Sequence, residues 1–305
     1  MIFPRLPLSF AFGATLALLL AAAAPALGRA ETPATDKVGA NATGWDLPEF
    51  IDRLPDLFPD RLPSFDRTGA LRIYVRPHFG DFLHRDYVRI PVGVRAKVTE
   101  NFESSTELEG YVTHGLGDAS AGYGFSNLRL GAKCEHVLPE FGVGGFSVGL
   151  NYQMPLGRPP LDLTDGYRHL QPYIAATHPL MPSWPMLGYA TLSADMLDRT
   201  VLKENFGRNQ LHSNSLTFSA GVAHEWTRFH GSLTATVNSS ALMSDETKQV
   251  YSLRPEVVLP WKSRSGSKTQ VLLTLGGRVV HGPDGTELGV SGSMRVEFNL
   301  KRGVK

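Results

Sequence analysis

The chain has 305 residues, with 30 lysines and arginines against 29 aspartates and glutamates, so its formal net charge is +1. That balance gives no electrostatic reason to expect a nucleic acid as the main partner. A single cysteine excludes an intramolecular disulfide and every metal site built from several cysteines, and we expect neither a metal nor a cofactor. The 31 glycines and 21 prolines are too many for a helical bundle. Composition therefore leaves a folded soluble domain or a β-barrel of alternating pattern.

Residues 1–30 have the composition of a secretory signal peptide. Arg5 precedes an apolar stretch from Leu8 to Ala26, and small residues continue to Ala30. This order predicts a Sec-type signal cleaved after Ala26 or Ala30, the alternative being an N-terminal membrane anchor. No later segment has the roughly 20 consecutive apolar residues of a transmembrane helix. The exported chain is therefore expected to be soluble or to cross a membrane as a closed barrel.

Residues 31–69 differ from the rest of the chain because Leu-Pro pairs recur at Leu47, Leu54 and Leu62. Each proline interrupts the hydrogen-bond ladder of a helix, so no long helix is expected here. We expect a Pro-rich periplasmic linker with a turn or two of amphipathic helix. The alternative is a plug-like or partner-docking arm that places apolar side chains such as Phe50 against a barrel mouth.

Residues 70–305 alternate between apolar and polar side chains with a period of two, as Val88 to Val98 do with Arg89 to Thr99. This pattern predicts an all-β fold, an antiparallel up-and-down transmembrane barrel of about twelve strands, each near the ~10 residues that a tilted membrane-spanning strand needs. The expected strands are 70–79, 87–99, 106–114, 126–137, 145–155, 169–177, 187–195, 215–227, 229–238, 250–261, 270–280 and 287–300.

The connections between these strands sort by length. The odd-numbered connections are 80–86, 115–125, 156–168, 196–214, 239–249 and 281–286, and they are generally longer than the even-numbered ones. Short periplasmic turns and longer external loops are typical of outer-membrane barrels. We expect the longest loop, 196–214, to fold over the mouth as a gate or to stand out as a mobile ligand surface.

The signal peptide, the alternating strands, the loop lengths and an amphipathic last strand together resemble Gram-negative outer-membrane β-barrel proteins. Such barrels usually end on an aromatic residue, whereas Phe298 is followed here by residues 299–305. The resemblance implies location in the cell outer membrane, with membrane lipid and the barrel-assembly machinery as partners. The stretch Asp165–Tyr173 (DGYRHLQPY) also resembles outer-membrane transporters of aromatic-degradation operons.

If the apolar face of each strand meets lipid, the polar face lines the lumen. Most of the inward cations then lie on the first, second and fourth strands, and this basic wall could attract anionic solutes. The alternative is that the charges pair internally and fill the barrel, since folding the chain about 100–105 places Lys97 opposite Glu109 and Arg95 near Tyr111. The expected lumen-lining candidates for solute contact are Arg72, Arg76, Arg89, Arg95, Lys97, Glu107, Glu109, Arg129, Lys133, Arg254, Arg278 and Arg295.

Three functions fit this pattern. The first is a narrow channel or transporter for small solutes, because twelve strands fall between barrels filled by side chains and wide porins. The second is a non-conducting structural or adhesive barrel whose external loops bind ligands. The third, a phospholipase-like enzyme, would use the residues near His212, but His212 and Ser213 are adjacent and a strand points them to opposite faces. We therefore do not expect an enzyme.

Overall fold

The computed structural model describes residues 71–79, 87–99, 101–113, 122–135, 145–160, 163–181, 184–226, 229–245, 247–261 and 269–300. All of them belong to one compact unit, Trp45–Lys305. The signal peptide expected at 1–30 and the arm expected at 31–69 lie outside the described residues, so both remain predictions.

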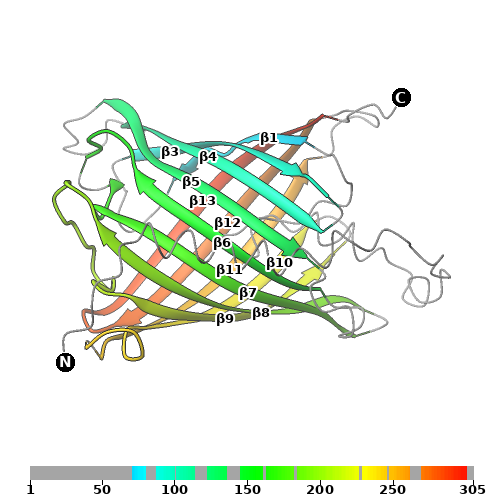
Figure 1. Cartoon of the computed structure of the whole chain (residues 1–305). Coiled ribbons are helices and arrows are strands. Elements are labelled where there is room, and N and C mark those ends of the chain that lie inside the picture. The colour runs from blue at the N-terminus through cyan, green and yellow to red at the C-terminus, as the bar shows by residue number, and fades with distance from the viewer. Residues whose placement is uncertain are drawn as a thin grey trace. The chain divides into compact units, whose positions relative to one another are not determined.

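The described residues form one antiparallel sheet that closes on itself (Figure 1). Each strand pairs with its neighbours in the sequence, and the last strand returns to pair with the first. The strands are β1 (Leu71–Val75), β2 (His78–Phe79), β3 (Tyr87–Lys97), β4 (Phe102–Thr113), β5 (Tyr123–Glu135), β6 (Phe146–Pro155), β7 (Tyr167–Met181), β8 (Trp184–Arg199), β9 (Ser215–Glu225), β10 (His230–Ser239), β11 (Gln249–Trp261), β12 (Thr269–Gly282) and β13 (Gly285–Leu300).

The segments β1 and β2 occupy a single position in the barrel, because both pair with β3 on one side and with β13 on the other. Pro77 separates them, since a proline has no N–H to donate to the ladder. The ladder resumes through neighbouring groups: Arg76 N donates to Pro91 O at 2.9 Å and Met294 N to Pro77 O at 3.1 Å. The barrel therefore has twelve strand positions, which confirms the fold class expected from the sequence.

Several strands extend beyond the ranges expected from the sequence. β4 begins at Phe102, where the sequence predicted a loop, because residues 102–105 contain no large apolar side chain apart from Phe102 to mark the alternation. The β3–β4 connection is correspondingly short, and Val98 N donates to Phe102 O at 2.9 Å. The β7–β8 hairpin is also longer than expected, with the described strands separated by residues 182–183 alone.

Alternation along the strands separates an apolar outer face from a polar inner face. On β3, Val92 and Val94 are 44% and 39% exposed, whereas the next residue, Arg95, is only 4% exposed. The same contrast recurs on β11, where Leu253 and Val257 face outward and Glu256 is buried. An apolar exterior around a polar interior is the pattern of a barrel that spans a lipid bilayer. Among the described residues, no helix has the length and apolar character needed to cross a membrane.

Inward tyrosines fill the space above glycines on neighbouring strands. A Cβ added to Gly93 would lie 2.5 Å from Cε1 of Tyr74, and the same distance applies to Gly149 and Tyr173. The rings therefore occupy the volume that any larger residue would need at the glycine positions. Four pairs follow this rule: Tyr74 on Gly93, Tyr111 on Gly124, Tyr173 on Gly149 and Tyr189 on Gly221.

Candidate functional site

The acidic side chains of β4 form the centre of a charged wall inside the barrel. Glu103, Glu107 and Glu109 follow one another on the inner face and are 1%, 7% and 1% exposed. Because an isolated buried carboxylate is costly, each needs a cationic or hydrogen-bonding neighbour. The adjacent strands β3 and β5, together with Tyr74 and Arg76 on the far side of β3, supply these neighbours, so the wall is built from side chains that are far apart in the sequence.

Arg129 on β5 connects two of these carboxylates. Its Nη1 lies 3.4 Å from Glu107 Oε1, its Nη2 lies 3.5 Å from Glu109 Oε2, and its Nε donates to Gln153 at 2.9 Å. Arg89 approaches Glu109 from β3 at 3.5 Å, and Arg76 approaches Glu107 at 3.7 Å. Glu109 is therefore held between arginines of its two neighbouring strands, and Glu107 between Arg129 of β5 and Arg76, which lies beyond β3 in the sheet.

Lys133 forms a second cluster toward the β3–β4 turn. Its Nζ lies 2.7 Å from Glu135 and 3.7 Å from Glu103, while Lys97 lies 3.7 Å from Glu135. The sequence had placed Lys97 opposite Glu109, and this is wrong. The observed register pairs Lys97 with Glu103, because β4 begins earlier than expected and the turn is tighter.

Tyr74 lies between two arginines on the same wall. Its hydroxyl donates to Glu107 Oε2 at 2.6 Å. The guanidinium carbons of Arg95 and Arg295 lie 4.8 and 5.1 Å from its ring centroid, which is the geometry of a cation–π contact. The tyrosine therefore allows two cations to be buried near one carboxylate. Sequence reasoning missed this role, although Tyr74 has the inward parity of Arg72 and Arg76.

Alternation and register place all twelve candidate residues on the inner face. They are not equally accessible. Arg72, Arg95, Lys97, Lys133 and Arg295 are deeply buried with the glutamates, whereas Arg278 is exposed. Glu103 was absent from the sequence-based set because it was assigned to a loop, although it is as buried as Glu109.

The opposite part of the inner wall, on β6 to β10, carries mostly neutral hydrogen-bonding groups. These side chains present hydroxyls and amides, and two of them bond across strands: Tyr189 to Thr234 at 2.6 Å and Ser219 to Thr236 at 3.0 Å. The inner face there includes Asn151, Gln153, Gln171, Thr191, Ser193, Ser215, Thr217, Ser219, Ser232, Thr234, Thr236 and Asn238. The inner face of β6 to β10 is therefore mostly neutral, whereas that of β1, β3, β4 and β5 is charged.

Two connections at one end of the barrel fold inward over its mouth; we call their described residues, 156–160, 163–166 and 200–214, together the strap. Leu163 is 2% exposed and packs against Tyr87 and Tyr111 on the inner ends of β3 and β4. Leu211 packs against Val250 and Val280 on β11 and β12. Each connection thus reaches strands that are several positions away from those it joins.

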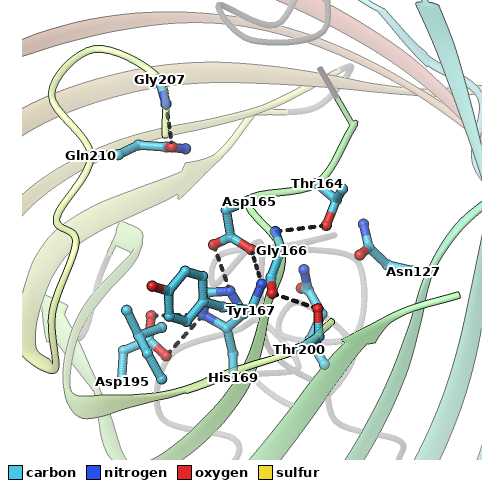
Figure 2. Close-up of polar contacts among 12 residues, drawn as sticks. Asn127, Thr164, Asp165, Gly166, Tyr167, His169, Asp195, Thr200, Gly207 and Gln210 are labelled. Atoms are coloured by element: carbon cyan, nitrogen blue, oxygen red, sulfur yellow. Dashed lines mark hydrogen bonds and ion pairs between the residues drawn. The ribbon is translucent and has the colours of Figure 1, made fainter. Parts of the chain in front are cut away.

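The two halves of the strap are bonded to each other. Thr200 Oγ1 donates to Gly166 O at 2.7 Å, and Asn205 N donates to Asp165 O at 3.1 Å. Gly166 has a φ of 83° and would place a Cβ 2.6 Å from Lys203 O, so only glycine fits this close approach. Figure 2 shows the joint, with Gly166 between Thr164 and Thr200.

His169 anchors this joint to the barrel wall. Its Nε2 lies 2.8 Å from Asp165 of the strap and its Nδ1 lies 3.1 Å from both oxygens of Asp195 on β8 (Figure 2). An ionised carboxylate only accepts hydrogen bonds, so a ring that donates from both nitrogens is the imidazolium. Aromatic packing continues from here, because Phe206 contacts Tyr167 at 5.2 Å and stacks on His212 at 4.3 Å.

The far end of the strap is tied to the β12–β13 turn. Asn209 N donates to Asp284 Oδ2 at 2.9 Å, its side-chain amide donates to Gly285 O at 3.2 Å, and Asp284 N donates to Asn209 Oδ1 at 3.1 Å. Arg208 adds a bond of 2.6 Å to Asp284 O and lies 3.5 Å from Glu287. Of the two arrangements expected for this loop, the structure shows the one folded over the mouth.

The residues of the phospholipase alternative have other contacts. The His212 ring stacks on Phe206, and Ser213 Oγ accepts a hydrogen bond from Ser244 at 3.0 Å. Within the ranges that the structure describes, no group of three or more histidine, cysteine, aspartate or glutamate side chains is arranged to hold a metal ion.

No family model and no curated protein sequence matches this chain. Solved structures of similar shape include an outer membrane channel from Pseudomonas putida F1, which is 14% identical, with a TM-score of 0.49, covering 81% of this chain and 99% of that one. They also include the KdgM porin in complex with disordered oligogalacturonate, at 7% identity and a TM-score of 0.47, covering 75% and 99%. The CymD monoaromatic hydrocarbon channel matches at 9% identity and a TM-score of 0.36, covering 77% and 90%. The fold of this chain is established by its own strand pairing.

Proposed function

We propose that the chain forms a narrow channel for small polar solutes in the outer membrane of a Gram-negative cell. The observation that carries this proposal is a polar, charge-lined lumen inside an apolar closed wall, with a bonded strap across one mouth. The polar side chains of the lumen can hydrogen-bond to water and to polar solutes, while the apolar exterior faces lipid. The strap restricts the size of what enters.

The topology follows from the lengths of the connections. The strap joins β6 to β7 and β8 to β9, and it lies at the end of the barrel formed by odd-numbered connections. Outer-membrane barrels carry their longer loops on the cell surface, so this end faces outward. Lipid surrounds the barrel, and the alternating last strand β13 is the segment that the assembly machinery would engage.

The experiment is single-channel recording in planar bilayers with the full mature chain. We expect small, steady currents, and we expect Asn209→Ala, which loosens the strap, to increase the conductance or make it flicker. Leu242→Ala is the matched control, because Leu242 is 81% exposed on the separate connection 240–248. If Asn209→Ala and Leu242→Ala give the same single-channel conductance and the same flicker, the strap does not control the current.

A second function is favoured by the burial of the charges. Glu103 and Glu109 are each 1% exposed, so much of the charged wall is packed rather than open to water. A lumen filled in this way suits a non-conducting barrel whose outer loops bind ligands. The absence of current from both the native chain and the Asn209→Ala variant would support this function instead.

A further inference from the structure

We propose that Asp165, His169 and Asp195 form an acid-sensitive latch, and that protons from the external medium loosen the strap and thereby increase the current through the barrel. This rests on the proposed channel function, of which it is the regulation. The three residues come from the strap, from β7 and from β8, and the joint between the two halves of the strap lies beside them (Figure 2).

The latch depends on three charges that water screens poorly. The His169 ring lies between the two carboxylates, with Nε2 at 2.8 Å from Asp165 and Nδ1 at 3.1 Å from Asp195, and it must donate from both nitrogens. The side chains of His169, Asp165 and Asp195 are only 14%, 19% and 22% exposed. Charge-assisted hydrogen bonds in such a position are stronger than an ion pair on an exposed surface.

Asp165 connects the latch to both halves of the strap. Its Oδ1 accepts a hydrogen bond from Tyr167 N at 2.9 Å, and its backbone oxygen accepts one from Asn205 N at 3.1 Å. The next residue, Gly166, accepts a hydrogen bond from Thr200 Oγ1 at 2.7 Å. The Asp165 carboxylate therefore fixes the turn at which the two halves meet. When it leaves the His169 ring, the joint loses this attachment to the barrel wall.

Acid acts on the two aspartates of the latch. An aspartate held ionised by a cation stabilises the closed strap, and this stabilisation is lost as the pH falls. With both aspartates ionised the latch carries one net negative charge. With both protonated it carries one net positive charge, because the imidazolium keeps its proton. A largely buried cation without an ionised partner is unfavourable, and movement of the strap lets water reach it.

The other groups around the ring do not replace the aspartates. Gln153 on β6 and Leu197 on β8 lie opposite His169 in the sheet, and both are neutral. Glu204 of the strap pairs with Arg199 at 3.0 Å and is 41% exposed, so water screens its charge. The charged or titratable side chains on the elements around the latch are Arg129, Tyr167, Arg199, Glu204 and His212.

The far attachment of the strap responds in the same direction but is not abolished. Asp284 Oδ2 accepts a hydrogen bond from Asn209 N at 2.9 Å, and protonation of Asp284 weakens that bond. The bond from the Asn209 amide to Gly285 O needs no charge, and neither does the packing of Leu163 and Leu211. We therefore expect acid to loosen the joint of the strap without detaching the strap from the barrel.

The test follows the mobility of a nitroxide spin label on the strap, using the full mature chain with Cys134→Ala in lipid vesicles. The label is attached at Val201→Cys, because Val201 is fully exposed and follows Thr200 of the joint. Between pH 7 and about pH 3, the range in which protein carboxyl groups take up protons, the mobile part of the spectrum should increase. We expect an increase of about tenfold, as for the loss of one hydrogen bond to a charged group. A label at Leu242→Cys, on another connection, should not respond.

The aspartate variants assign the response to the latch. Asp165→Asn combined with Asp195→Asn removes both charges and keeps the side-chain shapes, so the strap should be mobile at pH 7 and change little in acid. Asp198→Asn is the matched control, because Asp198 lies on the outer face of β8, paired with Arg168 at 3.5 Å. It should respond as the native chain does. A native strap that is equally mobile at both pH values, or a double variant that responds like the native chain, would overturn the latch.

Two further readouts separate the latch from the channel function. In ¹⁵N NMR at about pH 8, where an unperturbed histidine is neutral, the signals lost in His169→Gln should be those of a ring with both nitrogens protonated; a neutral ring would overturn the latch. Single-channel conductance should rise in acid in the native chain. If the strap loosens but no current flows at any pH, the latch stands and the channel function alone fails. A conducting barrel whose current ignores the loosened strap would overturn its control by the latch.

Discussion

Gly93→Ala tests whether the tyrosine–glycine contacts hold the charged wall together. The added Cβ would lie 2.5 Å from Tyr74 Cε1, well inside ordinary contact distance, so the ring must move. Tyr74 is 3% exposed and is held by Glu107 at 2.6 Å and by Arg95 and Arg295 over its ring. It therefore cannot move without breaking these interactions.

The size of the effect follows from the interactions that a displaced Tyr74 ring would break. A buried hydrogen bond to a charged acceptor contributes about 1.5–3 kcal/mol, and each cation–π contact contributes about 0.5–1 kcal/mol or more when desolvated. We expect Gly93→Ala to lower the free energy of unfolding by about 3–5 kcal/mol. Tyr74→Phe, which removes the hydroxyl and keeps the ring, should cost about 1.5–3 kcal/mol.

Equilibrium urea unfolding in lipid vesicles, followed by the altered electrophoretic mobility of the folded barrel, measures these differences. Gly122→Ala is the matched control, because nothing lies within 4 Å of an added Cβ at Gly122. If Gly93→Ala folds and unfolds within about 1 kcal/mol of the native chain, the tyrosine is free to move and the reasoning fails.

Three further predictions concern the two faces and the strap. Val92→Arg places a charge on the lipid face and should cost about 2–4 kcal/mol in the same unfolding assay, whereas Val92→Thr should be mild; equal tolerance would contradict the face assignment. Lys133→Met removes the cation that lies 3.7 Å from the buried Glu103 and should cost about 3–5 kcal/mol, which the added change Glu103→Gln should largely restore if the buried pair is the cause. Asn209→Ala removes the two side-chain bonds to Gly285 O and Asp284 N from a residue with φ of 54°, so trypsin added to intact cells should cut the strap faster while the barrel stays folded; cleavage only after outer-membrane permeabilisation would invert the topology.

Only part of the candidate site could be predicted from the sequence. Alternation put Arg72, Arg89 and Arg129 on the inner face, because a strand fixes the side of each residue by parity alone. It did not show which charges pair, because pairing depends on the register between strands. The predicted start of β4 was four residues too late, so the predicted partner of Lys97 was Glu109, whereas the structure pairs Lys97 with Glu103. Whether solute reaches the arginines remains a prediction.

The sequence by itself determined the barrel class, the twelve strand positions and the division into lipid and lumen faces. These are local properties, set by the period-two pattern and by the turns that interrupt it. Only the tertiary structure decided that Leu163 and Leu211 fold back onto opposite walls, that Asn209 holds the β12–β13 turn, and that the glutamates lie behind their arginines. Such contacts join residues far apart in the sequence, and no local pattern records which distant wall a loop will reach.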